Sequence, residues 1–280
     1  MRRMAELKGF LPPRSPQGRA SIVSAPPWHY SGDLLTVEYR AAPGAVARWL
    51  PDPIEPADED PDAVALIFAD WQSCSDSFEE LVDPVRSQYK ECFMVVRCRY
   101  RGERYSRCIN IWVDKDFALA RGWHQGYPKK LGSIWMTRPV RYGKAGPRLE
   151  PGGRFGASVS ANDRRIVEAR FTITGPSQSN GFVNALPMLH DRYAPSIVEG
   201  EPPSMDELVT MKSFDWEGSE IWEGDAELSL FDSPTEELTS LTPTEAIGAY
   251  YRSTGVTWGE GTKLADRRSR PGHPARRPRP

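Results

Sequence analysis

The sequence predicts an α+β fold that is mainly antiparallel β, with one large sheet that is curled or closed into a barrel. The first observation behind this prediction is a succession of strand-like runs joined by turn signals, such as Arg101-Gly102-Glu103 and Asn162-Asp163. The second is that no strand-like run alternates with a long helical pattern, which argues against a doubly wound parallel sheet. With 280 residues, the chain is also long enough to bury a sizeable core.

Strand patterns recur along most of the chain, recognised by apolar alternation or by short apolar runs. They occupy residues 34–40, 63–71, 88–100, 104–113, 133–142, 155–160, 164–174, 208–216 and 221–231. Pro139 interrupts one of these runs and predicts an edge strand or a bulge there. Residues 175–207 are expected to be mostly loop.

Helical signals are few. Short helices are expected at residues 43–50, 117–124 and 243–252. The last prediction rests on Thr242, which can cap a helix, and on Pro243, which suits a first helical position. The chain then divides into an irregular N-terminal arm (1–20), a single domain (21–262) and an Arg/Pro-rich tail (263–280) that is predicted to be disordered.

Composition limits the function classes. The formal net charge of −2 and a pI near 6.2 favour neither nucleic acid nor a membrane as partner. No apolar run approaches the roughly 18–20 residues that span a bilayer, and no secretory signal is recognisable, so a cytoplasmic location is expected. The four cysteines and the histidines show no metal-ligand spacing, which predicts buried free thiols and no metal site.

Residues 121–133 are the most informative stretch, because Lys129 and Lys130 stand together in one of the least polar parts of the chain. Desolvation disfavours a charged amine and leaves a nucleophile. Holding a lysine neutral near pH 7 takes about 4–5 kcal/mol. A second ammonium ~7 Å away supplies only about 2.4 kcal/mol at an effective dielectric of 20, so an apolar wall must supply the rest. The neighbours expected to form this wall are Trp123, Tyr127, Leu131 and Trp135.

Several motifs resemble the acetoacetate decarboxylase superfamily over most of residues 21–251. They are Pro26-Pro27-Trp28, Val37-Glu38-Tyr39-Arg40, Tyr89-Lys90-Glu91 and Gly126-Tyr127-Pro128-Lys129-Lys130-Leu131-Gly132. The last is the most specific, since a double lysine in an apolar loop is rare. The resemblance implies a cone-shaped β-barrel with a few flanking helices, usually assembled as a homo-oligomer. Acetoacetate decarboxylase is itself the standard example of a lysine activated by its surroundings.

The resemblance also assigns roles to single residues. Lys129 would form a Schiff base with the substrate, with Lys130 as its neighbour, and Glu91 would be the acid/base. Gln125 and Tyr89 would orient the substrate carboxylate or a departing hydroxyl. Trp123 is expected beside the substrate as part of the apolar wall. The resemblance implies no cofactor.

Three departures from the decarboxylases shift the expected reaction. Residues 29–32 lack the arginine that would hold a carboxylate, and residues 63–69 lack a second acid, with Asp70 as a possible stand-in. Gln125, four residues before Lys129, is similar to the branch that joins pyruvate to an aldehyde and dehydrates the adduct. The expected function is therefore a Schiff-base lyase acting on a short oxo acid and an aldehyde. Decarboxylation of acetoacetate or a related 3-oxo acid, and a non-catalytic ligand-binding barrel, remain alternatives.

Overall fold

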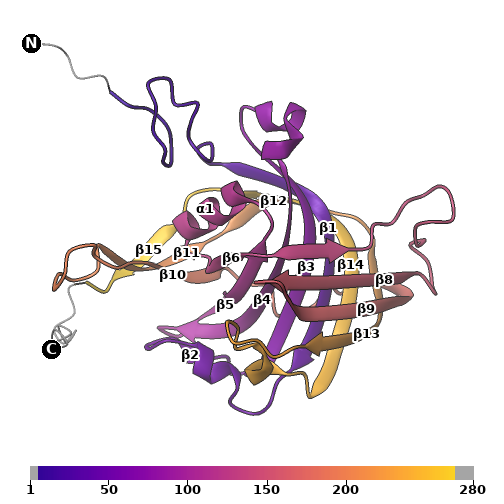
Figure 1. Cartoon of the computed structure of the whole chain (residues 1–280). Coiled ribbons are helices and arrows are strands. Elements are labelled where there is room, and N and C mark those ends of the chain that lie inside the picture. The colour runs from indigo at the N-terminus through magenta and orange to yellow at the C-terminus, as the bar shows by residue number, and fades with distance from the viewer. Residues whose placement is uncertain (1–5, 269–280) are drawn as a thin grey trace, which may run out of the picture.

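The computed structural model describes residues 6–268 and consists mainly of one antiparallel sheet, to which a single α-helix is attached in these residues (Figure 1). The strands are β1 (Trp28–Arg40), β2 (Glu55–Pro56), β3 (Ala63–Ser75), β4 (Gln88–Tyr100), β5 (Glu103–Val113), β6 (Lys129–Leu131), β7 (Ser133–Met136), β8 (Arg154–Ala161), β9 (Arg164–Ser177), β10 (Met188–Ala194), β11 (Met205–Met211), β12 (Ser213–Gly218), β13 (Ile221–Leu230), β14 (Glu245–Trp258) and β15 (Thr262–Asp266). The helix is α1 (Asp116–Gln125), and short 3₁₀ turns are η1 (Val46–Trp49), η2 (Glu79–Val82), η3 (Pro84–Arg86) and η4 (Leu238–Leu241).

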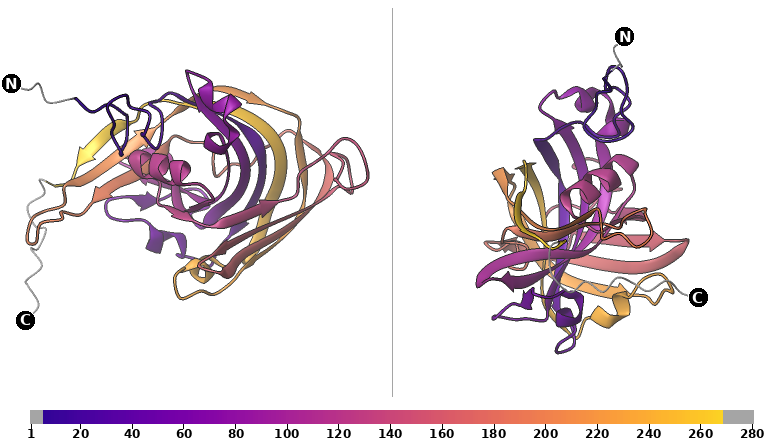
Figure 2. Two further views of the ribbon diagram at one scale, coloured as in Figure 1. Left: turned by 45° about the horizontal axis from the view of Figure 1, so that its top comes forward. Right: turned by 90° about the vertical axis from the view of Figure 1, so that its left-hand side faces the viewer.

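The sheet has 15 strands and runs in the order β15-β11-β10-β5-β4-β3-β1-β14-β13-β9-β8-β7, with β2, β6 and β12 attached beside this path. It is strongly curled, as Figure 2 shows in its left-hand view. Within residues 6–268 the end strands β15 and β7 do not pair with each other. The mainly antiparallel prediction is confirmed, whereas the expected barrel appears here as a curled sheet, and the few expected helices reduce to one α-helix and short turns.

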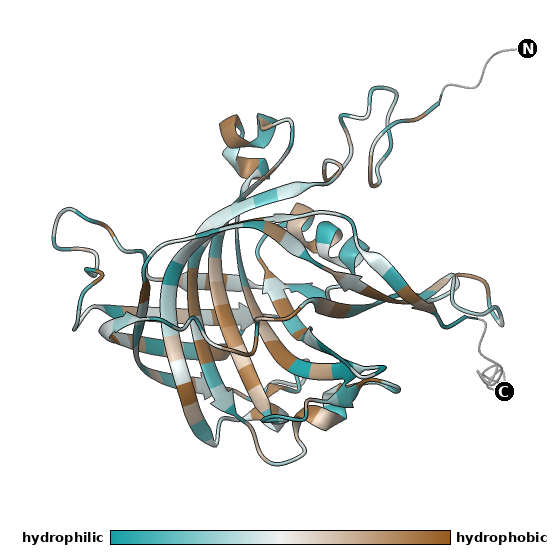
Figure 3. Ribbon diagram, turned by 180° about the vertical axis from the view of Figure 1, so that it is seen from behind, coloured by the Kyte–Doolittle hydropathy of each residue, from teal (hydrophilic) through white to brown (hydrophobic). Residues whose placement is uncertain are grey.

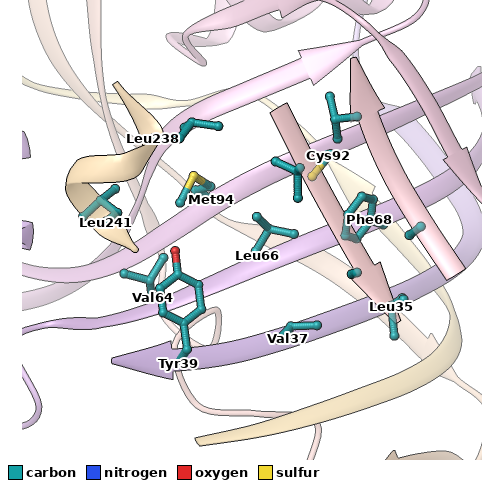
Figure 4. Packing of buried hydrophobic residues seen from close by; sticks show 14 of the residues in the cluster. Leu35, Val37, Tyr39, Val64, Leu66, Phe68, Cys92, Met94, Leu238 and Leu241 are labelled. Carbon is teal, nitrogen blue, oxygen red and sulfur yellow. The ribbon is translucent and has the colours of Figure 1, made fainter. Parts of the chain in front are cut away.

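Hydrophobic and less hydrophobic residues alternate along the central strands (Figure 3), and the two faces of the sheet contribute to two separate hydrophobic clusters. One face of β1 places Leu35, Val37 and Tyr39 in a cluster with residues of β3 and β4, closed by η4 (Figure 4). The opposite face places Leu34 in a second cluster, which Phe117 of α1 covers. The candidate site lies on this second face. All four cysteines are buried and free, as predicted.

The largest error in the expected secondary structure concerns residues 243–252, which are strand and not helix. β14 pairs with β1 along the whole length of β1, from Trp28↔Trp258 to Arg40↔Glu245. Thr242 and Pro243 offered only local capping signals, and burial of one face against the sheet outweighs them. Residues 188–194, expected in a loop, likewise form β10 and pair with β11.

The ends of the chain agree only in part with the expected divisions. Residues 6–20 form no helix or extended strand, only a bridge between Lys8 and Ser15. Residues 263–266 of the predicted tail join the sheet in β15, while the rest of the tail from 269 and residues 1–5 of the arm lie outside the described residues. Among residues 6–268, no helix combines the length and apolarity needed to cross a membrane.

Candidate active site

The chain reaches the site through the end of α1. Gly126 closes the helix with φ of 90°, a conformation that favours glycine, and its amide bonds back to the last helical turn. A Cβ at Gly126 would also lie 2.9 Å from the backbone oxygen of Asp191. The chain then enters β6, which runs parallel to β5 with Lys129 opposite Ile111. This pairing fixes the direction in which the Lys129 side chain points.

The two adjacent lysines face opposite sides, as expected for neighbours in an extended segment. Lys129 is 7% exposed and points inward. Lys130 points away and places its Nζ 2.5 Å from Oε2 of buried Glu236. Lys130 therefore has its own counter-charge outside the cavity, and the structure does not support its predicted place beside the substrate.

Lys129 meets Glu91 inside the site. Its Nζ lies 3.0 Å from Oε2 of Glu91, which is as buried as the lysine. The indole N–H of Trp71 donates to the other carboxylate oxygen over 2.8 Å and thereby orients it. A buried amine and a buried carboxylate are in contact, and each has few other polar partners. This pair is arranged for proton transfer to or from an atom bound at Nζ.

The pair opens onto a cavity of about 80 Å³. A volume of this kind holds several water molecules and thus suits a small organic molecule. Gln125 and Tyr89 also line it, as their predicted roles require. Its remaining walls come from Tyr30, Leu34, Trp71, Phe93, Ile111, Tyr127, Asn184, Met188, Trp216, Arg252, Thr254, Val256 and Trp258.

The predicted apolar wall is wrong in most of its members. Trp123, Leu131 and Trp135 are 63%, 58% and 66% exposed and lie outside the cavity. Trp123 instead donates its indole N–H to the backbone oxygen of Lys129 over 2.8 Å, so it holds β6 and does not contact substrate space. Neighbours in sequence are poor candidates for a wall, because an extended chain alternates its faces and the true walls come from distant strands.

Asp70 is not a stand-in for a second active-site acid. Its Oδ2 lies 2.6 Å from Nε of Arg138, and it lines a separate open groove on the molecular surface. Glu91 is thus the carboxylate that lines the cavity beside Lys129 among the described residues.

Two tyrosines supply neutral hydrogen-bond donors around the amine. The ring centroids of Tyr89 and Tyr127 lie 5.5 and 5.8 Å from Lys129 Nζ. Burial, followed by nearby negative charge at Tyr89, raises the pKa of Tyr89 well above its ordinary range, and burial likewise raises the pKa of Tyr127. Both phenols therefore keep their protons, and their π-faces favour a cation at Nζ.

Two arginines near the site were not among the predicted residues. Arg121 of α1 is 4% exposed and donates to the hydroxyls of Tyr30 and Ser73 over 2.8 and 3.2 Å. The Arg121 guanidinium thus contacts Tyr30 in β1, within the segment 29–32 that lacks the arginine of the decarboxylases. Arg252 lines the cavity from β14. The sequence could have indicated Arg121, because it is a single charged residue in the otherwise mostly apolar helix predicted at residues 117–124. It could not indicate Arg252, because residues 243–252 were predicted to be helix and a helix would direct that side chain differently.

Gly122 packs directly against the Lys129 side chain, and its lack of a Cβ leaves the space that this side chain occupies. A Cβ at Gly122 would lie 2.3 Å from Cδ of Lys129. We expect Gly122→Ala to keep the fold, because the lysine side chain can move, and to lower kcat about 100-fold, because the amine is misplaced. Gly175→Ala is the matched control, since nothing lies within 4 Å of its added Cβ. Equal kcat for the two variants would contradict this account.

His190 is buried behind Tyr127, with ring centroids 4.0 Å apart, and neither ring nitrogen has a hydrogen-bond partner in residues 6–268. Burial, then the positive charges of Arg107 and Lys129, lowers the pKa of His190 well below its ordinary value of 6.5. Below pH 6.5 the unfolded chain therefore binds a proton that the folded chain does not, and stability falls as pH falls.

The expected result is a free energy of unfolding about 1 kcal/mol lower at pH 5.5 than at pH 7.5 from this group alone, measured by urea denaturation. His190→Gln should remove this pH-dependent contribution of about 1 kcal/mol to the free energy of unfolding, whatever its effect on overall stability. His29→Gln, a substitution at a partly exposed histidine, should leave it in place. A pH dependence that is identical in wild type and His190→Gln would show that the imidazole is not held neutral.

The curled antiparallel sheet and the amine–carboxylate pair place the protein in the class of lyases that resemble acetoacetate decarboxylase. The chain belongs to this family: the family profile described as Acetoacetate decarboxylase (ADC) matches residues 11–267. The chain is also 24% identical over 242 residues to Acetoacetate decarboxylase 1 of Bradyrhizobium diazoefficiens, covering 85% of this chain and 86% of that protein. The resemblance drawn from the sequence motifs is confirmed.

Solved structures show stronger likenesses. The enduracididine biosynthesis enzyme MppR, complexed with the condensation product of pyruvate and imidazole 4-carboxaldehyde, is 39% identical with a TM-score of 0.87, covering 93% of this chain and 98% of that one. MppR complexed with pyruvate is 38% identical with a TM-score of 0.86, covering 94% and 99%. An acetoacetate decarboxylase-like enzyme from Sphingomonas wittichii RW1 is 25% identical with a TM-score of 0.84, covering 92% and 100%.

Proposed function

We propose that the chain forms a Schiff base between Lys129 and pyruvate, or a similar short 2-oxo acid, and joins it to an aldehyde with loss of water. The observation that carries this proposal is the 3.0 Å contact between Lys129 Nζ and Glu91 in a cavity of small-molecule size. Further support comes from the likeness to MppR, whose structures hold pyruvate and a product of its condensation with an aldehyde.

The steps follow from the amine and the carboxylate. Lys129 passes a proton to Glu91, and the neutral amine attacks the ketone carbon of pyruvate. Glu91 returns the proton to the hydroxyl that leaves as water, which gives an iminium. The iminium withdraws electrons from the methyl carbon, so that Glu91 can remove a methyl proton and leave an enamine. The enamine carbon attacks the aldehyde carbon, and the aldehyde oxygen takes up a proton. Glu91 then removes a second proton from the former methyl carbon, and the hydroxyl leaves as water, which forms the carbon–carbon double bond. Addition of water to the iminium releases an unsaturated 2-oxo acid and frees Lys129.

Gln125 and Tyr89 complete the proposed site. Both line the cavity, and each offers a donor that stays neutral: the amide of Gln125 and the phenol of Tyr89. In this role they hold the carboxylate or the departing hydroxyl while Glu91 moves protons. Trp123 and Lys130 have no part in it, because neither lines the cavity.

Borohydride trapping tests the proposal. The protein is incubated with pyruvate and borohydride, and the modified peptide is identified by mass spectrometry. We expect one reduced pyruvate adduct, on the Lys129 peptide. An unmodified protein under conditions that trap a known Schiff-base enzyme would reject the proposal.

Decarboxylation of acetoacetate is the second candidate, favoured by the match to the family profile. The same iminium can accept the electrons of a breaking carboxylate bond, so CO2 release from acetoacetate is measured beside condensation. We expect condensation to dominate. Fast CO2 release with no condensation would assign the decarboxylase activity, and neither reaction would favour a ligand-binding protein.

We also propose that the protein acts as a homo-oligomer in the cytoplasm. The sheet ends in the strands β15 and β7, and an exposed strand edge offers unpaired backbone groups to a second copy. Light scattering after gel filtration measures the assembly, and a monomer mass at micromolar concentration would reject it.

A further inference from the structure

One face of β14 lines the cavity, and it carries a charge. Arg252, Thr254, Val256 and Trp258 follow one another at every second position and all border the cavity. Arg252 is therefore directed at the same space as Lys129 and Glu91, although it belongs to a distant part of the chain. The pairing of β14 with β1 fixes this direction, with Arg252 opposite Leu34.

Arg252 and Glu91 lie on one row of the sheet. Glu91 pairs with Ala69, Ala69 with Leu34, and Leu34 with Arg252. Three strand spacings separate the two ends of this row, or about 14 Å along the sheet, and its curl shortens the direct path. The two side chains extend inward from the ends of this row. Both side chains line the cavity, so a ligand bound there can contact both of them.

Arg252 has no counter-charge in residues 6–268. No carboxylate there forms a salt bridge with it, and its one polar partner is the neutral amide of Asn180, whose oxygen accepts a hydrogen bond from Nη1. Burial lowers the pKa of Arg252, and no nearby acid offsets this effect. Glu91, the carboxylate among the described residues that line the cavity, is already engaged by Lys129 and Trp71. The cavity is therefore lined by the guanidinium of Arg252 in addition to the Lys129–Glu91 pair.

A partly buried guanidinium without a partner favours an anionic ligand, because a carboxylate can accept two parallel hydrogen bonds from it. Pyruvate bound at Lys129 has two neutral hydrogen-bond partners available for its carboxylate, Gln125 and Tyr89. Its carboxylate is one bond from the carbon attached to Nζ and so stays beside the lysine, near Gln125 and Tyr89. The group that meets Arg252 belongs to the second reactant.

We propose that Arg252 binds a carboxylate at the far end of the carbonyl partner, so that the natural acceptor is a short aldehyde with an acidic group. This inference rests on the proposed condensation and names its second substrate class. An aldehyde of equal length without the carboxylate leaves Arg252 unpaired in the cavity. The site then selects aldehydes that carry a carboxylate, which Arg252 binds, while the aldehyde carbon at the other end reacts with the enamine on Lys129.

The test compares two four-carbon aldehydes, succinic semialdehyde and butanal, as acceptors for the enzyme with pyruvate. Formation of the conjugated product is followed by its ultraviolet absorbance. We expect kcat/KM at least about 10-fold higher for succinic semialdehyde in the wild type, and within about 2-fold of butanal in Arg252→Gln. Arg170→Gln, which removes an exposed arginine on β9, is the control and should keep the wild-type preference.

A binding measurement separates this inference from the proposed function. Butyrate and butyramide have the same chain length and nearly the same shape, but only butyrate is an anion, and the cavity tryptophans report their binding by fluorescence. We expect butyrate to bind the wild type and to bind Arg252→Gln at least about 10-fold more weakly, with butyramide unaffected. That result without a pyruvate adduct would support the carboxylate site and reject the proposed condensation.

Two results would overturn the assignment. One is an aldehyde preference and a butyrate affinity that are the same in wild type and Arg252→Gln, or a wild type that binds no butyrate. The other is a variant whose KM for pyruvate rises while its aldehyde preference stays, because Arg252 would then hold the carboxylate of pyruvate itself. Circular dichroism of the variant confirms that the strand pairing of β14 is retained.

Discussion

Lys129→Ala is expected to abolish the borohydride-trapped pyruvate adduct and to lower turnover by at least about 10⁴-fold. The reason is that the described cavity residues include no second lysine that could replace its amine. The fold should persist, because alanine fits in the space that the lysine leaves and the Trp71 indole still donates to Glu91. The measurement is intact mass after trapping, together with the rate of condensation.

Lys130→Ala is the matched control for this result. The two lysines are adjacent, but Lys130 faces outward and pairs with Glu236. It should be trapped with pyruvate as efficiently as the wild type. An adduct that survives Lys129→Ala and disappears in Lys130→Ala would reverse the assignment of the nucleophile.

Glu91→Gln is expected to lower kcat by about 10²- to 10⁴-fold, the usual contribution of a positioned acid/base. Glutamine keeps the shape of the side chain and an oxygen for the Trp71 indole, but it cannot take up the methyl proton. The reduced pyruvate adduct should still form on Lys129, more slowly. Loss of turnover with retention of the adduct is the signature that separates proton transfer from folding.

Glu236→Gln provides the comparison, since Glu236 is a buried carboxylate paired with a lysine outside the cavity. Its turnover should stay within about 3-fold of the wild type, because neither Glu236 nor Lys130 lines the cavity. If Glu91→Gln behaved like Glu236→Gln, Glu91 would be a structural partner of Lys129 and the proton would move through another group.

Much of the fold could be predicted from the sequence, because each hairpin has a recognisable turn sequence between two strand-like runs. The Arg101-Gly102-Glu103 turn and the Asn162-Asp163 turn both join paired strands, β4 with β5 and β8 with β9. The strand β14 could not be predicted in this way. Its partner β1 lies more than 200 residues earlier, and only burial against that partner overrides the capping signals of Thr242 and Pro243.

The site shows the same division. Lys129, Glu91, Gln125 and Tyr89 could be proposed from motifs, and the structure brings all four to one cavity. Trp123 and Lys130 were placed there by proximity in sequence, yet both point away. Arg252 could not be found, since nothing in its neighbourhood indicates which face of β14 meets the cavity.

The sequence by itself determined the family and, through the resemblance to it, the choice of Lys129 over its neighbour, because the double-lysine motif is local and specific. Only the tertiary structure decided what surrounds the amine. Strand register across the sheet brings Glu91 into contact with the amine and places Trp71, Phe93 and Ile111 in the cavity wall. It also directs the positive charge of Arg252 into the same cavity. Register is set by burial and hydrogen bonding between segments far apart in the chain, which no local pattern records.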